Sequence, residues 1–343
     1  MKKVSPSLSI KVSRLSFVCA LLVVAIHCTV GDVLHPNGAF GWCQVFVNRG
    51  LTRMAVPFFF IVFGFFLFKD FEFSFAWWER KLINRAQTLL VPYWAWSVIG
   101  ILNLAIWNLF RRHPVPMDWC NFEWWLKVLG ITEAPIGSTV LWFVRVLLVA
   151  VLVSPILGVA VKRMSWGVPL FFLILQVVGV SNYCGNFFYV SVGAKLATMT
   201  GNCLERRFTL KRTALLVGMA WMSLIAIKTV LDLYGIANCG SRALCECMNV
   251  AGIVFVWMGY DCIARMLMWL DPIAKSSFFL YCAHPHVSMY WQYPLIHLST
   301  LSGHPWIFFC IAYVGMVVIP ILLWGFLGRI APRWMRLALS GGR

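Results

Sequence analysis

LSFVCALLVVAIHCTVGDVL, residues 15–34, is the stretch that decides the fold class of this chain. Apart from His27, it has no strongly polar side chain before Asp32, and so long an apolar run is typical of a membrane-spanning helix. An ionisable side chain inside a bilayer is costly, and such residues usually serve a function. His27 is therefore the first candidate for a catalytic residue. The alternative is a structural histidine that is hydrogen-bonded to a neighbouring helix.

The composition points to the same class of protein. Of 343 residues, 61% are hydrophobic and 12% are charged, about half the charged fraction of an ordinary soluble domain. We expect an all-α, polytopic integral membrane protein with one integral domain over residues 1–343, because no soluble stretch is long enough for a second core. The net charge of +17 does not indicate a nucleic-acid partner, because the basic residues lie in short segments between apolar runs.

Ten apolar segments are candidates for membrane spans. They are residues 15–34, 51–68, 86–110, 139–161, 165–181, 187–200, 213–235, 248–264, 274–293 and 305–328. The basic residues gather at the N-terminus, at the C-terminus and in every second loop between these segments. The positive-inside rule then predicts that both termini are cytoplasmic. We expect a multi-pass protein of the cell (cytoplasmic) membrane, in contact with lipid.

Several other polar residues fall within or beside the predicted spans. Arg53 stands at the outer start of the second span, so we expect it to share a cavity with His27 in the outer half of the bilayer. Snorkelling to the interface is the alternative for Arg53. Arg145 lies deeper, in the fourth span. In the ninth span His284 and His286 flank Pro285, and at least one of the two is expected to be structural.

Two further polar groups have a structural interpretation. Lys228 and Asp232 are spaced i,i+4, and we expect them to neutralise one another. The basic run ERKLINR, residues 79–85, is by default an anchor that obeys the positive-inside rule. Its functional interpretation is a site for the phosphates of an anionic cytosolic ligand, held by Arg80, Lys81 and Arg85. The cysteines have no zinc-like spacing, and we predict no metal site.

Five blocks occur in the order found in the membrane acyltransferase 3 family, which O-acylates surface glycans and related acceptors. They are LLVVAIH (21–27), RMAVPFFFIVFG (53–64), KLINRAQTLLVPY (81–93), LWFVR (141–145) and SFFLYCAH (277–284). The chain resembles this family over most of its length. It departs from the family at Ser16, where an arginine usually stands eleven residues before the histidine, on the same helix face. Arg14 lies on nearly the opposite face, which leaves open a divergent or non-catalytic descendant.

The resemblance implies O-acyl transfer across the membrane. The donor would be a cytosolic acyl-CoA, with acetyl-CoA expected, and its phosphates would meet Arg80, Lys81 and Arg85. The acceptor would be a hydroxyl of a surface glycan or a lipid-linked glycan. No cofactor would be bound permanently.

The same resemblance suggests roles for the site residues. His27 would act as the base that activates the hydroxyl, since the ordinary pKa of histidine is near ~6.5; alternatively it would carry the acyl group itself. Arg53 or Arg145 would stabilise the oxyanion or orient the acceptor. The residues expected to contact substrate are Trp142, His284 and His286.

A second function fits the same residues. In a polysaccharide or lipid-linked glycan exporter, the polar side chains would line a path rather than a reaction site. A purely structural scaffold is disfavoured, because scaffolds need few buried charges. Binding of labelled acetyl-CoA distinguishes the enzyme from the exporter.

Overall fold

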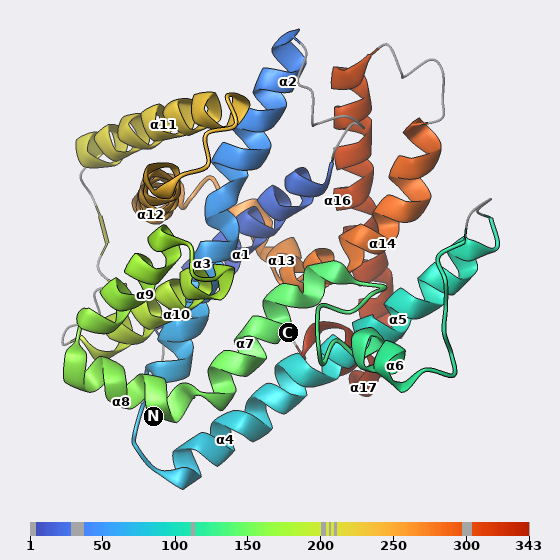
Figure 1. The fold of residues 1–343 in the computed structure, drawn as a ribbon, viewed down its shortest axis with the longest axis horizontal. Coiled ribbons are helices and arrows are strands. Elements are labelled where there is room, and N and C mark those ends of the chain that lie inside the picture. The colour runs from blue at the N-terminus through green and yellow to red at the C-terminus, as the bar shows by residue number, and fades with distance from the viewer. Residues whose placement is uncertain are drawn as a thin grey trace.

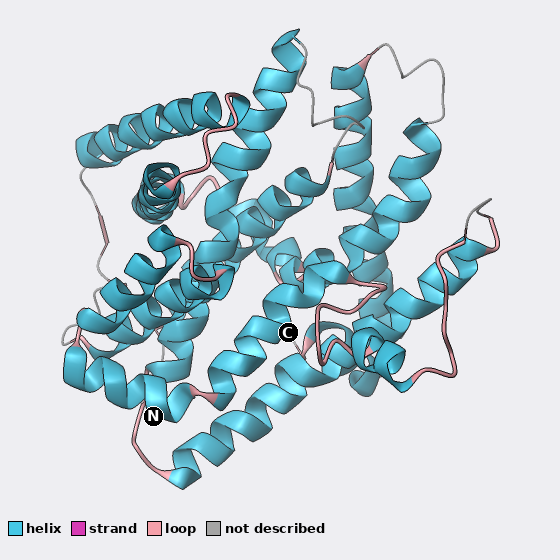
Figure 2. Ribbon diagram, viewed as in Figure 1, coloured by secondary structure: helices cyan, strands magenta, loops and turns pink. Residues whose placement is uncertain are grey.

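The computed structural model describes residues 5–28, 38–110, 114–199, 204–205, 207–208, 211–296 and 304–342. Over these residues the protein is built of helices and has no strand (Figures 1 and 2). The prediction of an all-α protein is confirmed.

The helices differ widely in length. The longer ones are α1 (Pro6–His27), α3 (Ala55–Phe68), α5 (Val91–Asn108), α10 (Asn182–Thr198), α11 (Lys211–Leu233), α12 (Cys239–Ile263), α14 (Ser277–Ile296) and α16 (Pro305–Ile330). The shorter ones are α2 (Gly38–Val45), α4 (Phe75–Arg85), α6 (Phe122–Val128), α7 (Trp142–Leu152), α8 (Ser154–Met164), α9 (Gly167–Val178), α13 (Asp271–Ala274) and α17 (Arg333–Ser340). A π-helical turn (Phe46–Gly50) followed by a 3-10 turn (Leu51–Met54) joins α2 to α3, and a π-helical turn (Ala86–Leu90) joins α4 to α5.

Among the described residues, six helices are long and apolar enough to cross a membrane. A seventh span arises if the bent pair formed by residues 139–152 and 154–164, with 70° between its halves, is counted as one. All ten predicted segments contain helix, but α9, α10 and α14 lie outside this set, so the count of ten is not confirmed. The shortest of them, α9, has 12 residues, whereas about 20 are needed to cross the hydrocarbon core. That both termini are cytoplasmic stays a prediction.

The ends of the predicted spans shift for local reasons. The first helix begins at Pro6 and not at Leu15, because the Ser5 hydroxyl accepts the Leu8 N–H at 3.3 Å and Pro6 occupies the first turn. It ends at His27, and the predicted remainder, residues 29–34, lies outside the described residues. The last predicted span, 305–328, agrees with α16 to within two residues at its end.

Helix α3 passes through the middle of the molecule, with α10 packed closely along it (Figure 1). Two glycines make this approach close. A Cβ on Gly64 would collide with the backbone of Val190, and a Cβ on Gly193 would collide with the carbonyl oxygen of Ile61. Small residues at such crossings let backbones approach in membrane proteins, where packing replaces the hydrophobic effect as the driving force.

Other long helices stand around this central pair. Helices α11 and α12 lie together on one side, and α14 and α16 lie together on the other (Figure 1). Helix α1 contacts α3, α14, α16 and α12. Its last residue, His27, is thereby brought to α14.

Candidate functional site

The central feature of the candidate site is a pair of histidines from distant parts of the chain. The rings of His27, at the end of α1, and His284, in the middle of α14, have their centroids 5.0 Å apart. His284 is completely buried, whereas the His27 side chain is exposed. The pair therefore has one accessible member and one fixed member, from two of the five blocks that carry the family resemblance.

The protonation of His284 follows from its hydrogen bond. Its Nδ1 lies 3.2 Å from the carbonyl oxygen of Leu280, and a carbonyl can only accept, so Nδ1 carries the hydrogen. Nε2 then has the lone pair. Nε2 is buried and has no hydrogen-bond partner among the described residues. Leaving a buried polar atom unpaired is costly, so Nε2 is suited to accept a hydrogen bond from a substrate hydroxyl, a water or His27.

His286 lies on the other side of α14, because two residues along a helix turn the side chain by about 200°. Its ring stacks on Trp96 of α5 at 5.5 Å, and its Nε2 is 3.4 Å from the Ser138 hydroxyl. Its Nδ1 is buried without a partner among the described residues. The two histidines that are neighbours in sequence thus lie in separate environments.

His286 also lines a small cavity of about 320 Å³ between α5, α14 and α16, together with Asn103, Tyr290 and Trp291. This cavity offers an amide, a phenol and aromatic faces. A sugar ring presents hydroxyls at its rim and C–H bonds on its faces, so this lining has the chemistry for a glycan acceptor.

The two arginines predicted for catalysis have partners elsewhere. Arg53 is exposed and lies near Cys245 of α12. Arg145 donates to the carbonyl oxygen of Thr132 at 2.8 Å, which fastens the loop before α7. Neither has a hydrogen bond to His27 or His284 within the described residues, and their roles stay predictions.

Trp142, predicted to contact substrate, begins α7 and is 40% exposed. Its ring centroid lies 6.5 Å from that of Phe60 on α3. Its contact with substrate also stays a prediction.

The basic residues of α4 are arranged around Asp70. Lys81 and Arg80 bind its carboxylate at 2.6 Å and 3.2 Å, and the Arg85 guanidinium lies 5.3 Å from the centre of the Phe63 ring. Burial raises the pKa of Asp70, but the hydrogen bond and charge of Lys81 and the charge of Arg80 outweigh it, so this pKa lies below its ordinary value. Arg80 is the most open of the three, with 56% of its side chain exposed, and is the best placed to meet an anionic ligand.

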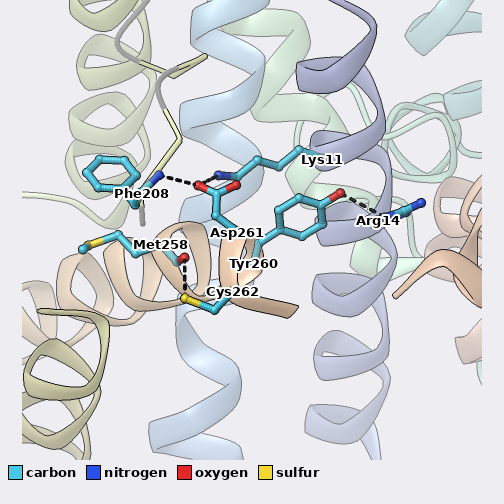
Figure 3. Close-up of polar contacts among 7 residues, drawn as sticks. All are labelled: Lys11, Arg14, Phe208, Met258, Tyr260, Asp261 and Cys262. Carbon is cyan, nitrogen blue, oxygen red and sulfur yellow. Dashed lines mark hydrogen bonds and ion pairs between the residues drawn. The ribbon is translucent and has the colours of Figure 1, made fainter. Parts of the chain in front are cut away.

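Arg14 lies in the first half of α1, away from His27. Its Nε and Nη2 bind the Asp271 carboxylate at 2.6 Å and 2.8 Å, and its Nη1 donates to the carbonyl oxygen of Ala264. Nη1 also donates to the Tyr260 hydroxyl (Figure 3). Such fork-shaped pairing fixes a guanidinium firmly. The Arg14 guanidinium is therefore held by Asp271, Ala264 and Tyr260, thirteen residues before His27 in the chain.

Asp271→Asn is expected to lower thermal stability at pH 7 and to remove an acid-dependent loss of stability. The hydrogen bond from Arg14 lowers the pKa of Asp271, so its stabilising effect is complete above the ordinary carboxyl pKa of ~3.9 and is lost as pH falls through the folded pKa. Unfolding temperatures from pH 7 to pH 3 measure both effects. Asp118→Asn, in an exposed loop, is the control. An identical pH profile for Asp271→Asn and wild type would contradict the assignment.

One buried acidic group, Glu246, was not predicted from the sequence. Glu246 on α12 accepts hydrogen bonds from Tyr189, from Gln176 at 3.2 Å and from Asn249 at 3.5 Å. It was missed because the segment before residue 248 is predicted to be an outer loop, whereas α12 begins at Cys239.

The predicted pair of Lys228 and Asp232 is confirmed.

Comparison with known proteins decides the family. The family described as an acyltransferase domain, acyltransferase 3, matches residues 15–325. The chain belongs to this family. It is also similar to the succinoglycan biosynthesis protein ExoH of Rhizobium meliloti (strain 1021), with 23% identity over 323 residues, 89% of this chain and 84% of that protein. No solved structure matches. The protein is therefore a multi-pass membrane acyltransferase, as the five blocks predicted.

Proposed function

We propose that this acyltransferase moves an acyl group, with acetyl expected, from cytosolic acyl-CoA to a hydroxyl of an extracytoplasmic glycan. The observation that carries the proposal is the contact between His27 and His284 in a chain of the acyltransferase 3 family. A polysaccharide acceptor is supported by the similar protein ExoH, whose name assigns it to succinoglycan biosynthesis.

His27 acts as the general base in the proposed reaction. Its imidazole takes the proton of the acceptor hydroxyl as that oxygen attacks the thioester carbon. The new C–O bond forms, the C–S bond breaks, and the imidazolium returns the proton to the departing CoA sulfur. A positioned base of this kind contributes about 10²–10⁴ in rate. His284, whose hydrogen sits on Nδ1, positions His27 or the acceptor through its free Nε2. Arg53 or Arg145 stabilises the oxyanion.

The donor's phosphates are proposed to meet Arg80, Lys81 and Arg85. Arg80→Gln is expected to raise the KM for acetyl-CoA about tenfold and leave kcat within about twofold, because hydrogen bonds to a charged group contribute about 1.5–3 kcal/mol and this contact is equal in ground and transition states. Initial rates at varied acetyl-CoA give both constants. Arg163→Gln, an exposed arginine of α8, serves as the matched control. A fall in kcat at unchanged KM would contradict the role.

The acceptor hydroxyl is proposed to lie at His27 and His284, and His286 and Trp142 are proposed as further contacts of the glycan. The function itself is tested with the purified protein in proteoliposomes, with labelled acetyl-CoA and either surface polysaccharide or lipid-linked oligosaccharide. Alkali-labile label on the glycan is the expected result. Failure to bind acetyl-CoA, together with movement of the glycan across the bilayer, would reject the enzyme in favour of the exporter.

A further inference from the structure

An apolar cavity of about 720 Å³ lies between α3, α9, α10 and α12. Its accessible lining is wholly apolar, with Val62 of α3, Leu173 of α9, Val192 of α10 and Val254 of α12 among its walls. Leu170 and Val254 are exposed. In a membrane-spanning region, exposed apolar side chains face lipid, so this cavity is open to the hydrocarbon.

A second cavity, of about 620 Å³, adjoins the first and has the opposite character. Four basic side chains, Lys11, Arg14, Arg207 and Arg265, line it against two acidic ones, Glu205 and Asp261. It lies at the end of α1 that carries the N-terminal basic residues, which is the end predicted to be cytoplasmic.

The two cavities share walls. Leu204 lines both. The Lys11 ammonium lies 4.3 Å from the centre of the Trp257 ring, which lines the apolar cavity. Phe208 also lines the apolar cavity, while its N–H donates to Asp261 at 3.0 Å, on the wall of the cationic one (Figure 3). A molecule with a polar head and an apolar chain would fill both.

The charges at the rim favour an anionic head. Lys11 is paired with Asp261 at 2.9 Å and Arg14 with Asp271 at 2.6 Å. Arg207 and Arg265 are exposed, and no acidic side chain of the described residues forms an ion pair with either. Basic pockets between helices on the cytoplasmic side suit the headgroups of anionic lipids.

We propose that these two cavities form a binding site for an anionic phospholipid of the cytoplasmic leaflet. One acyl chain occupies the apolar cavity, and the phosphate lies between Arg207 and Arg265. Arg14 precedes His27 by thirteen residues, about 20 Å along a helix. The lipid is therefore bound away from the histidine pair and is not the group transferred there. Its acyl chain packs between α12 and α3, α9 and α10.

Lipid binding to the delipidated full-length protein tests the site. Native mass spectrometry with phosphatidylglycerol and with phosphatidylcholine of equal chain length gives the two affinities. The wild type is expected to bind phosphatidylglycerol at least about tenfold more tightly. The double variant Arg207→Ala, Arg265→Ala should remove this preference, and Val254→Trp should weaken both lipids about tenfold by filling the cavity.

Matched controls separate the site from general effects. Arg329→Ala with Arg333→Ala removes two exposed basic residues elsewhere, and Leu322→Trp adds the same bulk to a lipid-facing position of α16; both should bind lipid as wild type does. Val254→Phe repeats the filling test with a smaller side chain if Val254→Trp unfolds. Wild-type affinity in both filled variants, or an undiminished preference in the double arginine variant, would overturn the proposal. Displacement of phosphatidylglycerol by equimolar palmitoyl-CoA would overturn it in favour of a donor site.

Discussion

His27→Ala is expected to lower the rate of acyl transfer to the glycan about 100-fold or more. Alanine cannot take the hydroxyl proton, and loss of a positioned base removes about 10²–10⁴ in rate. The ring pair with His284 is lost as well. Initial rates in proteoliposomes at matched protein amount give the ratio.

His304→Ala removes an exposed histidine at the start of α16 and should keep the wild-type rate. Full acylation by His27→Ala would contradict the assignment. The wild type incubated with labelled acetyl-CoA and no acceptor distinguishes the two roles open to His27. Label trapped on the protein and absent from His27→Ala would show an acyl carrier and not a base.

Gly193→Ala is expected to destabilise the protein by about 1–3 kcal/mol, the usual cost of overpacking. The new Cβ would meet the carbonyl oxygen of Ile61 and the amide nitrogen of Phe65. These are backbone atoms of α3 and cannot turn aside as a side chain does. Helices α3 and α10 must therefore separate along their whole contact. Unfolding in mixed micelles of rising SDS content measures the loss.

Gly259→Ala, near the C-terminal end of α12, is the matched control, because no atom outside the local helix backbone lies within 4 Å of the added Cβ. The stability of this variant should rise slightly, since alanine is preferred to glycine in helices by about 1 kcal/mol. Equal stability of Gly193→Ala and wild type would contradict the close crossing of α3 and α10.

Much of the fold could be predicted from the sequence, for a plain physical reason. The need to satisfy backbone groups in a bilayer leaves helices as the structure for long apolar runs, so the helices at residues 15–34 and 305–328 were predictable apart from their ends. The short apolar runs that became α9 and α10 carry no signal for whether they cross, because hydropathy does not report on the packing that lets a short helix be buried.

The candidate site was predictable only in part. His27, His284 and the arginines could be selected as candidate site residues, because an ionisable residue within an apolar run can be recognised in the sequence. The buried Glu246 could not, because the start of α12 determines whether it lies in a loop or in a helix. The pairing of Arg14 with Asp271 joins segments that are 257 residues apart. No local sequence pattern predicts such a contact.

The sequence by itself determined that this chain is an all-helical membrane protein of the acyltransferase 3 family and that His27 is its most anomalous residue, because hydropathy and motif order are properties of the chain. Only the tertiary structure decided which histidine meets which. His284 faces His27 across α1 and α14, while His286 turns to Trp96 and Ser138. Helix rotation separates neighbours in sequence, and helix packing brings together residues that are far apart in it.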